Sequence, residues 1–195
     1  MFLIFFIIAT MLNTGMCYLI WQKYNIEAKK IAVISGFIGG FLDTGIFMLD
    51  KSNIHAIELC ILSAFLIILS YIDIKLSKIP NKICIFIFAL GIINMFLMNA
   101  SIMKSLLTFI IIFFLMSFIY SFFGGRAIGG GDVKLISAAS IILGFWPSFY
   151  MIFISFLYAI IFHIIIYKRD FRKKAIKLGP YISLGIITLC IYMLI

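Results

Sequence analysis

Long apolar segments recur along the whole chain and are separated by short polar turns. Each apolar segment is close to the roughly 20 residues that an α-helix needs to cross a bilayer core of about 30 Å. Segments such as Leu106–Phe123 are apolar on every side, whereas a membrane barrel strand would alternate lipid-facing and lumen-facing residues. The pattern therefore predicts transmembrane helices near residues 2–20, 31–49, 56–72, 83–99, 102–123, 132–146, 148–167 and 179–195.

Composition places the chain in the same class. Of its residues 65% are hydrophobic and only 12% are charged, and the mean hydropathy is +1.25, far above that of a soluble globular domain. We expect an all-α, polytopic helix bundle with about eight transmembrane helices. A count of seven stays open, because the sixth and eighth segments are short and the fourth and fifth are close together. No internal repeat or linker appears, so residues 1–195 are expected to form one integral membrane domain.

The distribution of basic residues indicates how the helices are oriented. If the N-terminus lies outside, 14 of the 16 lysines and arginines fall in connections that face the cytoplasm, which agrees with the positive-inside rule. Only Lys51 and Lys104 fall on the other side. The net charge of +9 is then explained by orientation and by attraction to anionic lipid head groups, and nucleic acid is not expected as a partner.

Two aspartates stand where apolar segments meet polar turns. Asp73 follows the third segment and precedes a basic stretch that ends at Pro80. Because proline cannot continue a helix and restricts the residue before it, Asn81 is expected to cap a helix that begins at Lys82. An interfacial ion pair with the neighbouring lysines is an equally good explanation of Asp73 from this stretch alone.

Asp132 ends a short glycine-rich loop. Glycines 129, 130 and 131 precede it and allow close approach of the backbone to another part of the chain. A carboxylate in the first turn of a helix also complements the helix dipole, so helix capping alone would explain Asp132. The loop is not a phosphate-binding loop, because no lysine followed by serine or threonine stands at the required spacing.

Together the two aspartates indicate a chemical function. They lie 59 positions apart with two predicted helices between them, and an even number of crossings returns the chain to the same membrane face. Two carboxyl groups brought together cannot both ionise easily, so such a pair shares a proton and can act as base and acid at once. One aspartate can then activate a water molecule against a peptide carbonyl while the other donates a proton.

Three segments, in this order and at this membrane placement, resemble the type IV prepilin peptidases, which are membrane aspartic proteases of the GxGD type. The resemblance covers the chain from about residue 56 to its end. It implies that Asp73 and Asp132 are the catalytic pair. The expected substrate-loop and supporting residues are Gly129, Gly130, Gly131, Pro80, Asn81 and Lys134. The segments are Asp73 with Ile79-Pro80-Asn81, then Gly129-Gly130-Gly131-Asp132-Val133-Lys134-Leu135, then Leu178-Gly179-Pro180-Tyr181-Ile182-Ser183-Leu184-Gly185.

The resemblance also implies a substrate and a location. The expected substrate is the precursor of a type IV pilin or a pseudopilin, whose leader peptide is cut after a glycine on the cytoplasmic side of a bacterial cell membrane. Longer family members carry a cytoplasmic insertion with paired CxxC motifs and also methylate the new N-terminus. Here the first connection, near residues 22–30, is short and has no cysteine. We therefore expect a peptidase without methyltransferase activity and without a cofactor.

Two other classes of membrane protein compete with this interpretation. A small transporter could use Asp73, Asp132 and the intramembrane Asp43 for proton or cation coupling, but no inverted repeat is visible and both motif acids share one membrane face. A protease of the presenilin or signal peptide peptidase kind would share only the glycine-aspartate element, and the Ile79-Pro80-Asn81 turn argues against it.

Other polar residues in the apolar segments are expected to serve packing. Asp43 lies among glycines in the second segment, where a hydrogen bond between helices is the simplest explanation. His163 has no suitable neighbours for a metal site, so no metal is expected. The four cysteines show no CxxC spacing and are expected to be ordinary packing residues.

Overall fold

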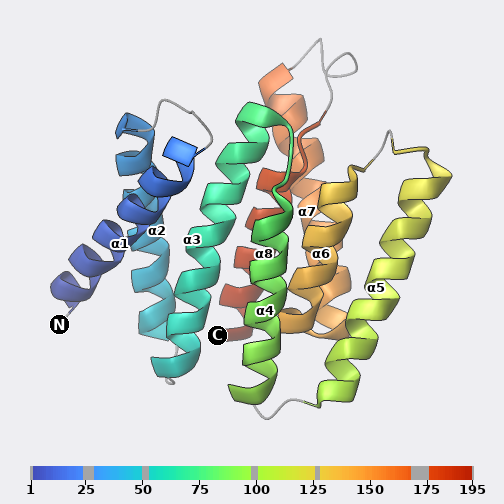
Figure 1. Cartoon of the computed structure of the whole chain (residues 1–195), viewed down its shortest axis with the longest axis horizontal. Helices are drawn as coiled ribbons and strands as arrows, with labels where there is room; N and C mark the ends of the chain where they lie inside the picture. Colours follow the sequence, from blue (N-terminus) through green and yellow to red (C-terminus); the bar gives the residue numbers. More distant parts are fainter. Residues whose placement is uncertain are drawn as a thin grey trace. The chain divides into compact units, whose positions relative to one another are not determined.

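A computed structural model describes residues 2–23, 29–49, 53–97, 101–125, 128–167 and 176–194. Within these ranges the chain forms α-helices and no β-strand (Figure 1). The helices are α1 (Phe2–Lys23), α2 (Lys29–Leu49), α3 (Asn53–Leu76), α4 (Asn81–Leu97), α5 (Ile102–Phe122), α6 (Gly130–Leu143), α7 (Phe145–Tyr167) and α8 (Gly179–Leu194).

The helices fall close to the predicted segments, with two informative differences. Helix α3 continues to Leu76, so Asp73 lies inside its last turn and not beyond its end. Helix α6 is only 14 residues long and ends at Leu143, and the φ of +83° at the next residue, Gly144, is the left-handed conformation that glycine adopts at little cost. Helix α7 then begins at Phe145, three residues earlier than predicted.

Three described helices are long and apolar enough to cross a bilayer: Ile57–Leu76, Ile102–Phe122 and Phe145–Ile166. Shorter apolar helices occur at Phe6–Gly15, Val33–Ile46, Asn81–Leu97 and Gly179–Met193. The all-helical class and the membrane character are thus confirmed. That all eight helices cross the membrane, with the N-terminus outside, stays a prediction.

The chain divides into two compact units, residues Met1–Ile68 with Met193–Ile195, and residues Leu69–Tyr192. Helix α3 continues from the first unit into the second. The second unit holds both motif aspartates. The single peptidase domain expected over residues 1–195 remains a prediction.

A buried hydrogen-bond cluster joins the helices of the first unit. Asp43 on α2 is only 3% exposed. Its carboxylate accepts a hydrogen bond of 2.6 Å from the Asn13 amide on α1 and another from the Ser63 hydroxyl on α3. Helix α2 also lies very close to α1, since a Cβ atom added at Gly40 would come within 2.1 Å of Thr10. The expected role of Asp43 in helix packing is confirmed.

Helix α6 lies at the centre of the second unit, in contact with α4, α5 and α7 (Figure 1). Most of its side chains are buried, and many are small. The buried hydroxyls of Ser137 and Ser140 bond to backbone carbonyls of their own helix, at Val133 and Ser137, so they create no unpaired polar atom. Small residues let neighbouring helices approach, which fixes the first turn of α6 and with it Asp132.

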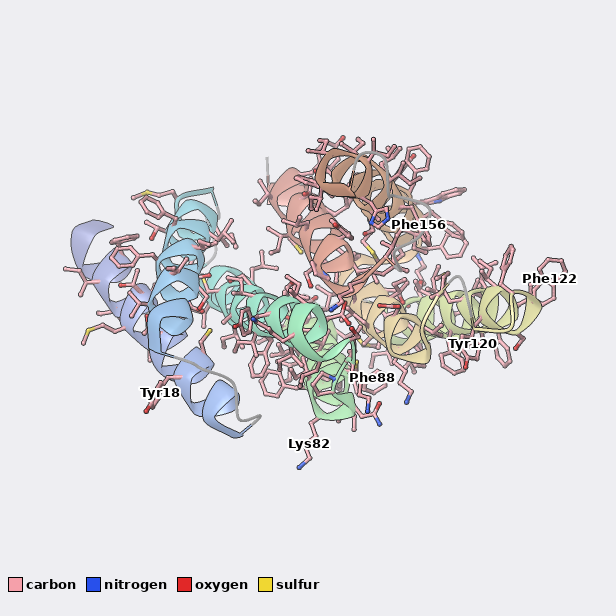
Figure 2. The ribbon with its side chains drawn as sticks, turned by 90° about the horizontal axis from the view of Figure 1, so that it is seen from above. Tyr18, Lys82, Phe88, Tyr120, Phe122 and Phe156 are labelled. Carbon is pink, nitrogen blue, oxygen red and sulfur yellow. The ribbon has the colours of Figure 1, made fainter. Side chains whose placement is uncertain are left out.

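The outward faces of the helices are apolar. On α5, Phe114 and Phe118 are each 68% exposed and Phe122 is 74% exposed. Figure 2 shows Phe122 pointing away from the neighbouring helices at the end of α5. A soluble monomer rarely exposes so many large apolar side chains, and in a membrane protein the same surface contacts lipid.

The remaining polar and sulfur-containing residues are packed as expected. Cys17, Cys84 and Cys190 are buried, Cys60 is partly buried, and none forms a disulfide. His163 is also buried. Among the described residues no group of three His, Cys, Asp or Glu side chains is placed to hold a metal ion.

Candidate active site

Asp73 is held by the start of a helix that is distant in the sequence. It lies in the last turn of α3 and is 7% exposed. The backbone N–H of Gly179, the first residue of α8, donates a hydrogen bond of 3.0 Å to Asp73 Oδ2. The end of α3 carries the negative end of its own helix dipole, whereas the start of α8 offers a positive one. The carboxyl group of Asp73 is therefore stabilised by α8 and not by its own helix.

Asp132 is held in a similar way by its own loop. It is the third residue of α6 and is 8% exposed. The backbone N–H of Gly129 donates a hydrogen bond of 3.0 Å to Asp132 Oδ2. This is half of a capping box, in which a side chain at the third helical position satisfies a free N–H of the cap residue. The capping role considered for Asp132 is thus real, and it leaves Oδ1 without a donor among the described residues.

Two contacts join the Asp73 turn to the Asp132 loop. Ile79 packs directly on Gly131, where an added Cβ atom would come within 2.8 Å of the Ile79 Cβ. The Lys134 ammonium donates a hydrogen bond of 2.9 Å to Asn81 Oδ1. Position 131 must therefore be a glycine, because any larger side chain would clash with Ile79 in the turn between α3 and Pro80. An added Cβ at Gly130 meets nothing within 4 Å, and nothing in the structure explains a glycine there.

The two carboxyl groups are close enough to interact electrostatically. Both belong to the second unit, where the end of α3 and the starts of α4, α6 and α8 lie at one end of the helices (the upper end in Figure 1). The expectation that two intervening helices return the chain to the same end is confirmed. Two nearby carboxyl groups that are shielded from water favour a state in which one of them keeps a proton.

The expected capping by Asn81 is wrong. Helix α4 begins at Asn81, and the N–H groups of Ile83 and Cys84 in its first turn bond to the Pro80 carbonyl at 3.0 and 3.4 Å. The Asn81 side chain is instead engaged by Lys134. Sequence distance explains the error: local capping rules consider neighbours along the chain, and Lys134 lies 53 positions away.

Lys177 is a site residue whose role the sequence did not indicate. It was counted only as part of an orienting basic loop, of which residues 168–175 lie outside the described ranges. Its ammonium donates a hydrogen bond to the carbonyl of Ile74, next to Asp73, and its charge interacts with the Asp73 carboxyl. Lys177 also caps a free carbonyl at the end of α3. The resemblance includes the neighbouring segment Leu178-Gly179-Pro180. Nothing in the sequence of this segment indicates that it contacts Asp73.

The fold and the site together define a helical membrane protein with a pair of interacting carboxyl groups at the ends of its helices. A comparison with protein-family models matches residues 60–164, more than half of the chain, to the type IV leader peptidase family. The chain belongs to this family, and it is a peptidase whose substrates are of the prepilin type in general. Neither the curated proteins nor the solved structures gave a match.

The contact between Gly179 and Asp73 gives a direct test of how the site is built. A Cβ atom added at Gly179 would lie 2.8 Å from Asp73 Oδ2 and 2.9 Å from the Asp73 Cβ. Gly179→Ala must therefore displace Asp73 or the start of α8. A displacement of about 1 Å can lower a catalysed rate by about 100-fold, so we expect peptidase activity to fall by about 10- to 100-fold.

The matched control is Gly15→Ala on α1, where an added Cβ atom meets nothing within 4 Å. Both variants would be purified in the same detergent and compared by thermal unfolding and by the rate of precursor cleavage. Gly15→Ala should keep full activity, because the added methyl group contacts nothing. Undiminished cleavage by Gly179→Ala would show that Asp73 does not depend on this contact.

Proposed function

We propose that this chain is an aspartic endopeptidase that removes the leader peptide of a type IV prepilin or pseudopilin precursor, and that Asp73 and Asp132 are its catalytic pair. The single observation that carries the proposal is that two buried carboxyl groups, in a member of the leader peptidase family, lie on segments that pack directly on each other through Ile79 and Gly131. Both aspartates fall inside the matched range. The family match favours this function over the transporter alternative.

The mechanism requires one ionised and one protonated carboxyl group. The ionised aspartate removes a proton from a water molecule, and the resulting hydroxide attacks the carbonyl carbon of the scissile peptide bond. The protonated aspartate donates its proton to the carbonyl oxygen. As the tetrahedral intermediate breaks down, the aspartate that took the proton from water passes it to the leaving amine nitrogen, the C–N bond breaks, and the other aspartate recovers a proton from a hydroxyl group of the intermediate. The two Oδ2 atoms are held by glycine N–H groups, so both Oδ1 atoms remain for the water and the substrate.

The surrounding residues support this geometry. Ile79, next to Pro80, packs the turn between α3 and α4 against Gly131. The hydrogen bond from Lys134 to Asn81 links the start of α4 to α6. Gly129 orients Asp132 through its N–H. No nucleophilic side chain takes part in this mechanism. We also propose that the chain is a peptidase alone, because its first connection carries no CxxC pair.

Replacing either aspartate tests the assignment. Asp73→Ala and Asp132→Ala each remove a group that transfers a proton in the transition state, a contribution of typically 10²- to 10⁴-fold. We expect each variant to cleave a co-expressed pilin-type precursor at least about 100-fold more slowly than the wild-type protein. N-terminal sequencing and mass spectrometry of the product would identify the cleaved bond.

The control for this experiment is Asp43→Asn in the first unit, whose amide oxygen can accept the hydrogen bond from Asn13 while its amide nitrogen donates to the Ser63 hydroxyl oxygen, and which is expected to cleave normally. Retained cleavage in both alanine variants would exclude the proposed pair. Mass spectrometry of the same product also tests for N-methylation. A methylated N-terminus formed with this protein as the sole catalyst would contradict the proposal of a peptidase alone.

The shared proton makes the activity dependent on pH. At strongly alkaline pH the second carboxyl group loses its proton, and no acid remains to protonate the carbonyl oxygen of the scissile bond. We expect kcat to fall on the alkaline side, measured with purified protein in detergent over a range in which thermal unfolding shows the fold intact. A flat profile into the strongly alkaline range would contradict a proton-sharing pair.

We further propose that the site faces the cytoplasm of a bacterial cell and that the N-terminus lies outside. The basic residues at the end of the second unit that carries the site support this orientation. They are Lys75, Lys78, Lys82, Lys134 and Lys177, all exposed. A precursor with a short basic leader and an apolar membrane helix would present its cleavage point at this interface.

Thiol labelling in whole cells tests the orientation. Lys78→Cys, in the turn after α3, and Lys104→Cys, in the first turn of α5, introduce exposed thiols predicted to lie on opposite sides of the membrane. A membrane-impermeant maleimide should label Lys104→Cys in intact cells and Lys78→Cys only after permeabilisation. The wild-type protein, with its free native cysteines, measures the background. The reversed labelling pattern would place the site on the outer side.

A further inference from the structure

The two carboxyl groups of the candidate pair have nearly the same burial and the same backbone support. Asp73 is 7% exposed and Asp132 is 8% exposed. Each accepts one hydrogen bond of 3.0 Å from a glycine N–H at the start of a helix, α8 for Asp73 and α6 for Asp132. Both therefore lie at the positive end of a helix dipole. A difference between them must come from nearby charged side chains.

The segment that leads into α8 contacts the last turn of α3 at two points. The Lys177 ammonium donates a hydrogen bond to the Ile74 carbonyl. Two residues further along, the Gly179 N–H donates to Asp73 Oδ2. This segment thus holds a positive charge beside the Asp73 carboxyl group and interacts with it. An opposite charge nearby favours the ionised form of a carboxyl group.

Among the described residues, no cation is placed in the same way at Asp132. Lys134 lies two positions further on α6, about 200° around a helix of about 3.6 residues per turn. Its ammonium is bonded to the start of α4 instead. Lys75 stands in the same relation to Asp73 on α3, so the lysines on the two helices do not distinguish the carboxyl groups. Lys177 is therefore the charge that makes the pair asymmetric.

The other titratable groups around the pair do not cancel this asymmetry. In the part of the chain that the structure describes, neither carboxyl group makes a hydrogen bond or an ion pair with a side chain. His163 lines a pocket together with Ile74 and Lys177, so a proton on its ring would add positive charge on the Asp73 side. The titratable side chains at this end of the surrounding elements are Tyr71 and Lys75 on α3, Lys78 in the turn, Lys82 and Cys84 on α4, Tyr120 on α5, His163 on α7 and Tyr181 on α8.

We propose that Lys177 is a positioning residue that fixes the two roles within the pair: it keeps Asp73 ionised as the base, and Asp132 holds the proton as the acid. Asp73 then takes the proton from water and later passes it to the leaving amine nitrogen. Asp132 protonates the carbonyl oxygen and recovers a proton from a hydroxyl group of the intermediate. The inference rests on the proposed function and extends it, because the pair alone leaves the two roles interchangeable.

The pH dependence of cleavage distinguishes the two assignments. The kcat/KM profile falls on the acid side when the ionised aspartate gains a proton, and on the alkaline side when the other aspartate loses its proton. If Asp73 is the ionised member, Lys177→Met should move the acid limb to higher pH by about 0.3–0.7 unit, the effect of one exposed charge. If Asp132 were the ionised member, only the alkaline limb would move, and the proposal would be overturned.

Two matched variants control for loss of charge and for loss of contact. Lys177→Arg keeps the positive charge and should restore the wild-type acid limb. Lys82→Met removes a lysine from the same end of the unit and should keep the wild-type profile, because Figure 2 shows Lys82 pointing away from the helices. Thermal unfolding would show that each variant is folded. An acid limb that stays in place in Lys177→Met, or that moves as far in Lys82→Met, would overturn the proposal.

A titration without substrate separates failure of this assignment from failure of the proposed function. Protein labelled with ¹³C at the aspartate carboxyl carbons would be titrated in detergent by NMR, with Asp73→Asn and Asp132→Asn used to assign the two resonances. Asp73 should ionise at the lower pH, and Lys177→Met should narrow the interval between the two midpoints. Asp132 ionising first, or an interval that Lys177→Met leaves unchanged, would exclude the role of Lys177. If the titration holds but no precursor is cleaved, the proposed function fails and the charge asymmetry stands.

Discussion

Burial of two carboxyl groups among apolar helices is the constraint on which the rest of the site depends. An acidic side chain costs about 2.5–3.5 kcal/mol at the centre of a membrane helix on insertion scales, and less towards the helix ends, where both aspartates lie. A hydrogen bond to a charged group contributes roughly 1.5–3 kcal/mol. One backbone N–H for each carboxyl group, from Gly179 to Asp73 and from Gly129 to Asp132, therefore offsets much of the cost of ionising either group alone. Repulsion between two charged carboxylates favours a pair in which one member keeps its proton.

Hydrophobic pattern predicted most of the fold. Helix number and position follow from apolar segments of membrane-spanning length, interrupted by proline, glycine and charge. The errors arose where a polar residue continues a helix or a turn depends on tertiary packing. The apolar pattern of the third segment ends before Asp73, whereas α3 continues past it, and the Gly179 N–H at the start of α8 stabilises the carboxyl group inside the last turn. Helix α7 begins immediately after Gly144, which the sequence did not distinguish from other glycines.

The catalytic pair could be proposed from the sequence, but the residues that hold the two carboxyl groups in place could not. Asp73 and Asp132 are unusual in their apolar surroundings, and the even number of helices between them places them at the same end. Their partners follow no local rule: Gly179 lies 106 positions from Asp73, and Lys177 lies 103 positions from Ile74.

The most direct test of the account is an experimental structure of the protein in lipid, at a resolution that shows ordered water. The central claim is that Asp73 and Asp132 act on one water molecule. The account predicts one water within hydrogen-bond distance, about 2.6–3.2 Å, of a free oxygen on each carboxyl group. Carboxyl groups held too far apart to share a water, each neutralised by its own lysine, would contradict it.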